Sequence, residues 1–69
     1  MCYWFERGGT YIRCEVRETG GEYELRISRP DGTESVEHFV EPSGLHGRQV
    51  VLERRLIDEG WNGPHGWTI

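Results

Sequence analysis

The sequence contains no lysine and no alanine, and it has only two cysteines and one methionine. No apolar run approaches the roughly 20 residues that cross a bilayer. The segment from Met1 to Arg7 is too short and too soon charged for a secretory signal peptide. A secreted domain of this size usually carries more disulfides than two cysteines allow. These absences predict a cytoplasmic protein with free thiols and without membrane contact.

Spacings that build metal, phosphate or nucleophilic sites are also missing. The two cysteines and three histidines include no pair with the close separation of a zinc finger or ribbon. No glycine-rich phosphate loop occurs. Cys14 is expected in the core and Cys2 near the chain terminus, so neither thiol has an expected base within reach. We therefore expect no enzyme activity, no metal and no cofactor, and we infer no small-molecule substrate.

Length and charge restrict the partners. A chain of 69 residues is expected to form one domain, 1–69, and such a chain buries only about 60% of its unfolded surface. Small domains often gain further apolar burial by pairing, so we expect a protein partner or a second copy in a homodimer. Twelve acidic residues against eight basic ones, all arginine, give a net charge of −4. Nucleic-acid binding would therefore need a local basic patch.

Glycine-centred turns divide the first part of the chain, 1–41, into four short segments. Within them, apolar and charged residues alternate with a period of two, which is typical of strands with one buried face. A helix-like pattern follows over 43–59, and a turn-rich tail covers 60–69. The sequence therefore predicts a single α+β domain. Three to four antiparallel strands form a meander, one C-terminal helix covers one face of it, and an irregular tryptophan-containing tail follows.

Two hairpins are predicted at Gly8-Gly9 and Gly20-Gly21, because tandem glycines satisfy the positive φ angles of a two-residue turn. The first turn directs Tyr3 and Phe5 inward. The second is selected because it pairs arginines with glutamates across the strands. The predicted pairs are Tyr3 with Cys14, Phe5 with Ile12, Trp4 with Arg13, Arg17 with Glu24, and Glu15 with Arg26.

The first hairpin has an alternative register. A three-residue loop over 7–9 would bury Trp4 and set Cys2 opposite Cys14. Only this register permits an intrachain disulfide. We favour the two-residue turn, which leaves Cys2 and Trp4 on the outer face.

A third hairpin is predicted with Asp31-Gly32 as a two-residue turn. The resulting pairs are Val36 with Ile27, Val40 with Tyr23, and Glu37 with Arg26. In this register His38 points inward beside Leu25, as a hydrogen-bonded residue at the border of the core. Phe39 is left facing outward.

The outer face of the predicted sheet combines aromatic and charged side chains. Its members are Trp4, Tyr11 and Phe39 among Arg13, Arg17, Arg26 and several glutamates. Exposed aromatics interleaved with arginine are typical of protein interfaces and of base-stacking platforms. Ordinary cross-strand pairing on a solvated sheet is the alternative explanation.

The helix is expected to begin after Pro42, with Ser43 as its cap, and to stop at Gly60. One stripe of it is apolar and should cover the inner face of the sheet. The members of this leucine stripe are Leu45, Leu52 and Leu56, with Gln49 between them. Val50 and Ile57 lie on a flank of the same helix. They either widen the core contact or form a seam for self-association or a partner.

Two tryptophans lie in the predicted tail. Trp61 directly follows the glycine stop and is expected to pack back on the last helical turn. Trp67 lies beyond further helix-breaking residues. It either folds over the edge of the core or inserts into another molecule.

Three antiparallel strands followed by a helix resemble, in element order, the plant AP2-type DNA-binding domains and the arm-type DNA-binding domains of phage integrases, which read a groove with the bare face of a sheet. The resemblance rests on element order, carries no motif and transfers no residue. Those domains are basic, whereas charges of both signs alternate on the corresponding face here. We therefore expect a non-catalytic module that binds a protein partner or a second copy, or an accessory subunit that folds fully only with its partner. The alternative is a nucleic-acid-binding module that uses Trp4, Tyr11, Arg13, Arg17 and Arg26.

Overall fold

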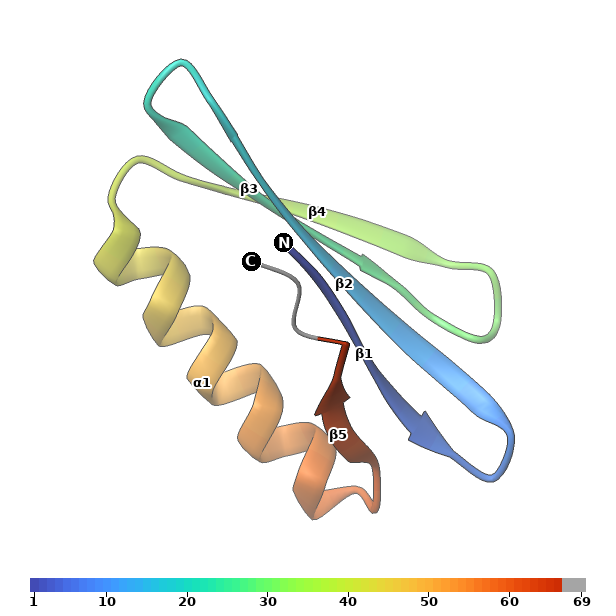
Figure 1. Ribbon diagram of the computed structural model, residues 1–69. Helices are drawn as coiled ribbons and strands as arrows, with labels where there is room; N and C mark the ends of the chain where they lie inside the picture. Colours follow the sequence, from blue (N-terminus) through green and yellow to red (C-terminus); the bar gives the residue numbers. More distant parts are fainter. Residues whose placement is uncertain (67–69) are drawn as a thin grey trace.

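Five antiparallel strands and one helix make up most of residues 1–66, the part of the chain that the computed structural model describes (Figure 1). In chain order the elements are β1 (Cys2–Arg7), β2 (Thr10–Thr19), β3 (Glu22–Ser28), β4 (Glu34–Phe39), α1 (Pro42–Asp58) and β5 (Asn62–His65). The strand order in the sheet is β4-β3-β2-β1-β5. The first four strands form a meander, and the fifth returns to pair with the first.

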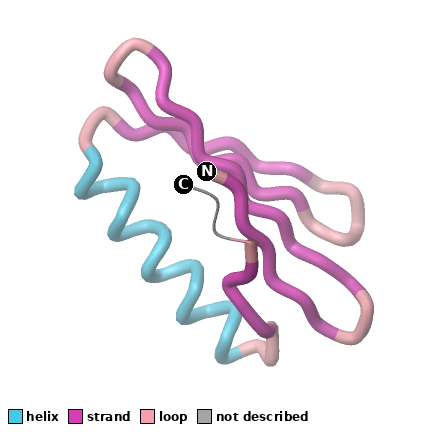
Figure 2. Tube along the Cα trace, viewed as in Figure 1, coloured by secondary structure: helices cyan, strands magenta, loops and turns pink. Residues whose placement is uncertain are grey.

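The domain has two layers (Figures 1 and 2). Helix α1 crosses one face of the sheet, and no described element covers the other face. The predicted α+β meander covered by one helix is confirmed, with a fifth strand added to it. Among the described residues, no helix is long and apolar enough to cross a membrane.

The first two hairpins have the predicted two-residue turns. All five predicted cross-strand pairs, from Tyr3 with Cys14 to Glu15 with Arg26, are present. Cys2 lies opposite Glu15 on the outer face, while Cys14 lies on the inner face. The two thiols are therefore free and on opposite sides of the sheet, and the alternative register with its disulfide does not occur.

The third hairpin differs from the prediction by one residue. The amide of Gly32 donates to the Arg29 carbonyl at 3.0 Å, and the amide of Arg29 donates to the Thr33 carbonyl at 2.9 Å. Gly32 has a φ of 87°. This is a β-turn begun by Pro30 and followed by a glycine bulge, a three-residue loop that shifts the register. The carboxylate of Asp31 accepts hydrogen bonds from the Thr33 hydroxyl and amide, and these bonds lower the pKa of Asp31.

The shifted register reverses the predicted faces of β4. The observed pairs are Leu25 with Glu37, Arg26 with Val36, Ile27 with Ser35, and Tyr23 with Phe39. His38 therefore lies exposed on the outer face opposite Glu24, and the prediction that it points inward is wrong. Phe39 faces inward and packs against the core, again contrary to prediction. Val36 is exposed on the outer face, and Val40 lies beyond the strand with 74% of its surface exposed.

Glu37 is brought to the inner face, where it joins β4 to the helix. Its carboxylate accepts a hydrogen bond from Nε of Arg48 at 2.8 Å. The helix begins at Pro42, one residue earlier than predicted, and Glu41 is its extended N-cap without a side-chain cap bond. Ser43 is therefore not the cap. Proline is well suited to this first helical position, because it has no amide hydrogen to leave unpaired.

The leucine stripe packs on the inner face of the sheet, as predicted. The buried core consists of Tyr3, Phe5, Ile12, Cys14, Leu25, Ile27, Leu45, Leu52, Leu56 and Trp61. Gln49, the polar residue between the leucines, donates from Nε2 to the Tyr3 hydroxyl at 3.0 Å. The amide thereby gives the buried phenol a polar partner, which a buried hydroxyl requires.

The end of the helix is fixed by a glycine and a tryptophan. Gly60 has a φ of 91°, and the Trp61 amide donates to the Leu56 carbonyl at 2.9 Å. Trp61 packs back on the helix as predicted and is only 6% exposed. Arg7 at the end of β1 lies 4.4 Å from the Trp61 ring centroid and donates from Nη1 to the Glu59 carbonyl at 2.7 Å. A cation at a helix C-terminus is favourable, because it compensates the helix dipole.

Part of the predicted irregular tail is a strand. β5 pairs with β1 through Trp4 with His65 and Glu6 with Asn62. A Cβ added at Gly63 would lie 2.7 Å from Cδ2 of Phe5, so only glycine permits this close approach. Trp67 lies outside the described residues.

Candidate functional site

The outer face of the sheet carries a network of ion pairs. Glu15 pairs with Arg17 at 3.0 Å and with Arg13 at 3.5 Å. Arg26 pairs with Glu34 at 2.9 Å and with Glu24 at 3.1 Å. These arginines are exposed or half exposed, so each pair contributes little to stability. The pairs nevertheless neutralise much of the positive charge of this face.

One end of the outer face is apolar and hollowed. Cys2, Trp4, Tyr11 and Arg13 line a hollow of about 370 Å³, which we call the aromatic hollow. Trp4 is 39% exposed and Tyr11 is 56% exposed. Nε of Arg13 donates to the Cys2 sulfur at 3.3 Å, which holds the guanidinium over the hollow. The predicted clustering of Trp4, Tyr11 and Arg13 on this face is therefore present.

β5 supports the edge of this hollow. The Trp4 ring lies 6.0 Å from the His65 ring, centroid to centroid. A Cβ at Gly66 would overlap the Trp4 ring, so the backbone of that glycine lies against the indole. Trp4 is thus held in place on one side and open on the other, as a rigid contact residue would be.

The other residues predicted to form an interaction surface do not join the aromatic hollow. Val50 is 37% exposed and Ile57 is 50% exposed on the helix, so their flank is not used up by the core. Trp61 is buried and cannot contribute an exposed ring. Phe39 packs against the core instead of facing outward. Arg26 lies on the outer face opposite Glu15 and does not line the aromatic hollow.

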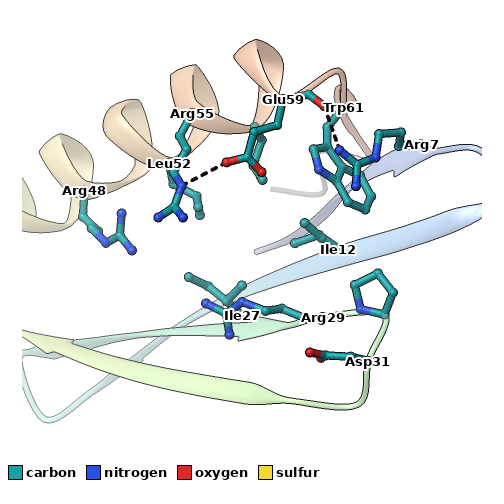
Figure 3. A pocket seen from close by; sticks show the side chains of 12 residues that line it. Arg7, Ile12, Ile27, Arg29, Asp31, Arg48, Leu52, Arg55, Glu59 and Trp61 are labelled. Carbon is teal, nitrogen blue, oxygen red and sulfur yellow. Dashed lines mark hydrogen bonds and ion pairs between the residues drawn. The ribbon is translucent and has the colours of Figure 1, made fainter.

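A second hollow, which sequence reasoning missed, lies between α1 and the opposite, inner face of the sheet (Figure 3). Its volume is about 360 Å³. It is lined by Arg7, Ile12, Ile27, Arg29, Pro30, Asp31, Arg48, Leu52, Arg55, Leu56, Glu59 and Trp61. We call it the arginine cleft, because four of the eight arginines of the chain lie on its wall.

The arginines reach the cleft from distant parts of the sequence. Arg7 ends β1, Arg29 follows β3, and Arg48 and Arg55 lie on α1. The spacing of 48 and 55 is the only local signal, because seven residues return to nearly the same side of a helix. The other two positions come together only through the fold.

Tyr3 and Cys14 form a buried polar pair on the inner face. Burial raises the pKa of the Tyr3 phenol to about 12, although the hydrogen bond from Gln49 acts in the opposite direction. Burial likewise raises the pKa of the Cys14 thiol to about 11, against the effect of its hydrogen bond with Tyr3. Both groups are therefore neutral at physiological pH. A neutral, inaccessible thiol is a poor nucleophile.

Comparison with known proteins gave no relative from which to transfer a role. No family model, no curated protein and no solved structure matches the chain. Within residues 1–66, no three His, Cys, Asp or Glu side chains come together in a way that could hold a metal ion. The aromatic hollow and the arginine cleft are the two largest hollows described above, and their chemistry is the basis for what we propose next.

Proposed function

We propose that this chain is a non-catalytic interaction module, cytoplasmic and in a reducing environment, that binds a protein partner or a second copy of itself through the aromatic hollow. The carrying observation is the residue composition of that hollow. Trp, Tyr and Arg are the residue types most enriched at the energetic centres of protein interfaces, and here one of each lines a single concave surface.

The exposed aromatic rings and the charged surface around them favour a protein as the ligand. Trp4 and Tyr11 present large rings on few rotatable bonds, so little conformational entropy is lost when a partner covers them. The surrounding outer face carries both arginines and glutamates, which suits a polar rim around an apolar centre. An inserted apolar side chain of the partner would fill the hollow.

The ion pairs argue against nucleic acid as the ligand. Arg13, Arg17 and Arg26 each have a glutamate within ion-pair distance. A phosphate backbone would have to displace these carboxylates and would face them afterwards, at the cost of like-charge repulsion. A protein surface with charges of both signs meets no such cost.

Light scattering combined with size-exclusion chromatography, over a concentration series, tests self-association. Crosslinking to lysate proteins through a photoreactive group at position 6, which lies opposite Tyr11 on the outer face, tests a foreign partner. We expect one of the two to be positive, and we expect W4S/Y11S to abolish it. A V50S/I57S variant is the matched control on the helix flank. If this control removes the interaction and W4S/Y11S does not, the helix flank is the surface; if the protein stays monomeric and crosslinks to nothing, the proposal is wrong.

The nucleic-acid alternative makes a separate prediction. It requires salt-sensitive retention on heparin or single-stranded DNA that Arg13→Glu abolishes. We expect the unmodified chain to pass through both columns at low salt. Retention of the unmodified chain together with loss in the variant would favour nucleic acid over protein.

A further inference from the structure

The arginine cleft has a composition unlike that of the rest of the molecule. The chain as a whole has a net charge of −4, yet four arginines and only two acidic residues, Asp31 and Glu59, line this hollow. Its lining therefore has a net charge of +2, from four positive and two negative side chains. We propose that the cleft binds the carboxylate of an amphipathic acid, with the charged group against the arginines and the apolar part on the core.

Two of the four arginines have no ion-pair partner among the described residues, so they can pair with a ligand. Arg29 donates from Nη1 to the Ser35 hydroxyl at 3.1 Å, and Arg7 donates to a backbone carbonyl and lies over Trp61. Within residues 1–66, neither guanidinium has a carboxylate within ion-pair distance. Asp31 is the acidic residue nearest in sequence to Arg29; its carboxylate binds the Thr33 amide and hydroxyl and attracts Arg29 through space, without an ion pair between them.

The other two arginines are neutralised and positioned. Nε of Arg48 binds Glu37 at 2.8 Å, and Nε of Arg55 binds Glu59 at 3.1 Å. In Figure 3, Arg48 and Arg55 project from the helix toward the sheet, and Arg29 approaches the same gap from the sheet side. A guanidinium presents a planar fork that matches a carboxylate with two parallel hydrogen bonds. The geometry places Arg29 as the principal ligand-binding cation, with Arg48 and Arg55 on the opposite wall.

The apolar lining determines what the carboxylate is attached to. Ile12 and Ile27 from the sheet, and Leu52 and Leu56 from the helix, lie beside Trp61 in the cleft. No hydroxyl or amide side chain is among the described residues that line it. An alkyl or aromatic group is buried there without losing a hydrogen bond, whereas the hydroxyls of a sugar would have to pair with the same arginines and carboxylates that an acid group needs. The volume of about 360 Å³ falls within the range of small-ligand pockets.

The same chemistry can come from two sources. One is a small free acid, and the other is the end of a polypeptide whose last residue is apolar. Both present one carboxylate beside one apolar group. The same side chains of the cleft would bind either ligand, so a small acid and a peptide are tested separately.

The first measurement is a titration of the full chain, labelled with ¹⁵N, with octanoate, followed through amide chemical shifts. We expect saturable shifts at Ile12, Ile27 and Leu52, and weaker binding as salt is raised. Octan-1-ol is the control for the apolar part alone. If octanol produces the same shifts at the same concentration, or octanoate produces none, the proposal is wrong.

Arginine variants locate the charge. Arg29→Gln is expected to weaken octanoate binding by about tenfold, the usual effect of losing one charge-assisted hydrogen bond. Arg54→Gln is the matched control, because Arg54 is an exposed helical arginine that does not line the cleft. Both positions are exposed, and the amide spectrum of each variant reports whether it remains folded. Equal affinities of the two variants would overturn the assignment.

The second arm uses a tripeptide that ends in leucine, with a free or an amidated C-terminus. Binding of the free-ended peptide with displacement of octanoate supports the site and extends it to polypeptide ends. Binding of octanoate alone supports a small-acid site. Binding of the amidated peptide as tightly as the free one contradicts the role of the carboxylate. Tyr11→Ser should leave every one of these affinities unchanged, which separates this inference from the proposed protein interface.

Discussion

At the scale of single residues, the two cysteines have opposite environments although the sequence separates them by little. Cys14 has no exposed surface, and burial raises its pKa to about 11. Cys2 is half-buried on the outer face, where its sulfur accepts a hydrogen bond from Arg13. Because Cys2 pairs with Glu15, the neighbour of Cys14, the alternation of faces along β2 places one thiol on the outer face and the other in the core.

We expect one thiol of the folded protein to react with a water-soluble disulfide reagent and the other to react only on unfolding. At about pH 8, Cys2 should be modified rapidly, whereas the buried neutral thiol of Cys14 should be protected by a factor set by global unfolding. The absorbance of the thiolate released by the reagent, followed over time with and without guanidinium, measures the two reactions. Cys2→Ser is the control and should remove the fast phase only. A fast phase that persists in this variant would show that Cys14 is accessible.

At the scale of elements, β5 depends on glycine. A Cβ at Gly63 would approach Phe5 within 2.7 Å and the Trp4 carbonyl oxygen within 2.9 Å. A Cβ at Gly47, in the second turn of α1, would meet no atom within 4 Å apart from the neighbouring backbone of its own helix, and the φ of this glycine is not positive. Replacement by alanine should therefore affect stability in opposite directions at the two positions. One is required by packing, and the other only weakens a helix.

Gly63→Ala is expected to lower the free energy of unfolding by about 1 to 3 kcal/mol, because the added carbon overpacks the β1–β5 contact. Gly47→Ala is expected to raise it by about 0.5 to 1 kcal/mol, because alanine loses less backbone entropy in a helix. Urea denaturation followed by circular dichroism measures both. Unchanged or increased stability of Gly63→Ala would contradict the placement of β5 against Phe5, and decreased stability of Gly47→Ala would contradict the helix-entropy argument.

Local patterns predicted the elements that rest on local chemistry. The first two hairpins followed from tandem glycines and from the pairing of Arg17 with Glu24. The third was misplaced because Pro30 begins a type of turn that needs one residue more than Asp31-Gly32 alone suggests. β5 has no strand pattern, since Asn62 to His65 contains glycine and proline and pairs only because β1 offers an unpaired edge.

At the scale of the whole molecule, two ionisable side chains of the core make the free energy of unfolding fall at alkaline pH. The pKa of Cys14 is raised from 9.0 to about 11, and that of Tyr3 from 10.0 to about 12. Both groups are buried in their neutral forms. Their stabilising contribution is therefore complete below pH 9.0 and is lost as the pH rises through the folded-state values, because the unfolded chain releases these protons first.

We expect the urea midpoint to stay level between about pH 7 and pH 8 and to fall progressively from about pH 9 to pH 11. Cys14→Ala should flatten the earlier part of this decline, although it lowers stability at neutral pH by leaving a small cavity. Tyr11→Phe is the matched control, since Tyr11 is exposed. If the control flattens the profile and Cys14→Ala does not, the buried pair is not its cause.

The arginine cleft also belongs to this scale. No window of the sequence brings Arg7, Arg29 and Arg55 together, because each lies in a different part of the fold. The aromatic hollow was predictable in part, since Trp4 and Arg13 are cross-strand neighbours of a hairpin with a recognisable turn. Sites built across one hairpin can be derived from a single sequence, whereas sites built between layers require the fold.

The return of β5 to β1 has a consequence for synthesis. Trp4 meets His65, and Glu6 meets Asn62, so the first strand is paired on both edges only after the ribosome has added all the other described elements. Until then the nascent chain displays an unpaired strand edge and an uncovered patch of core where Trp61 will pack, both of which invite contact with other chains. β1 therefore precedes the other described strands in synthesis, yet it gains its second neighbour only when β5 is in place.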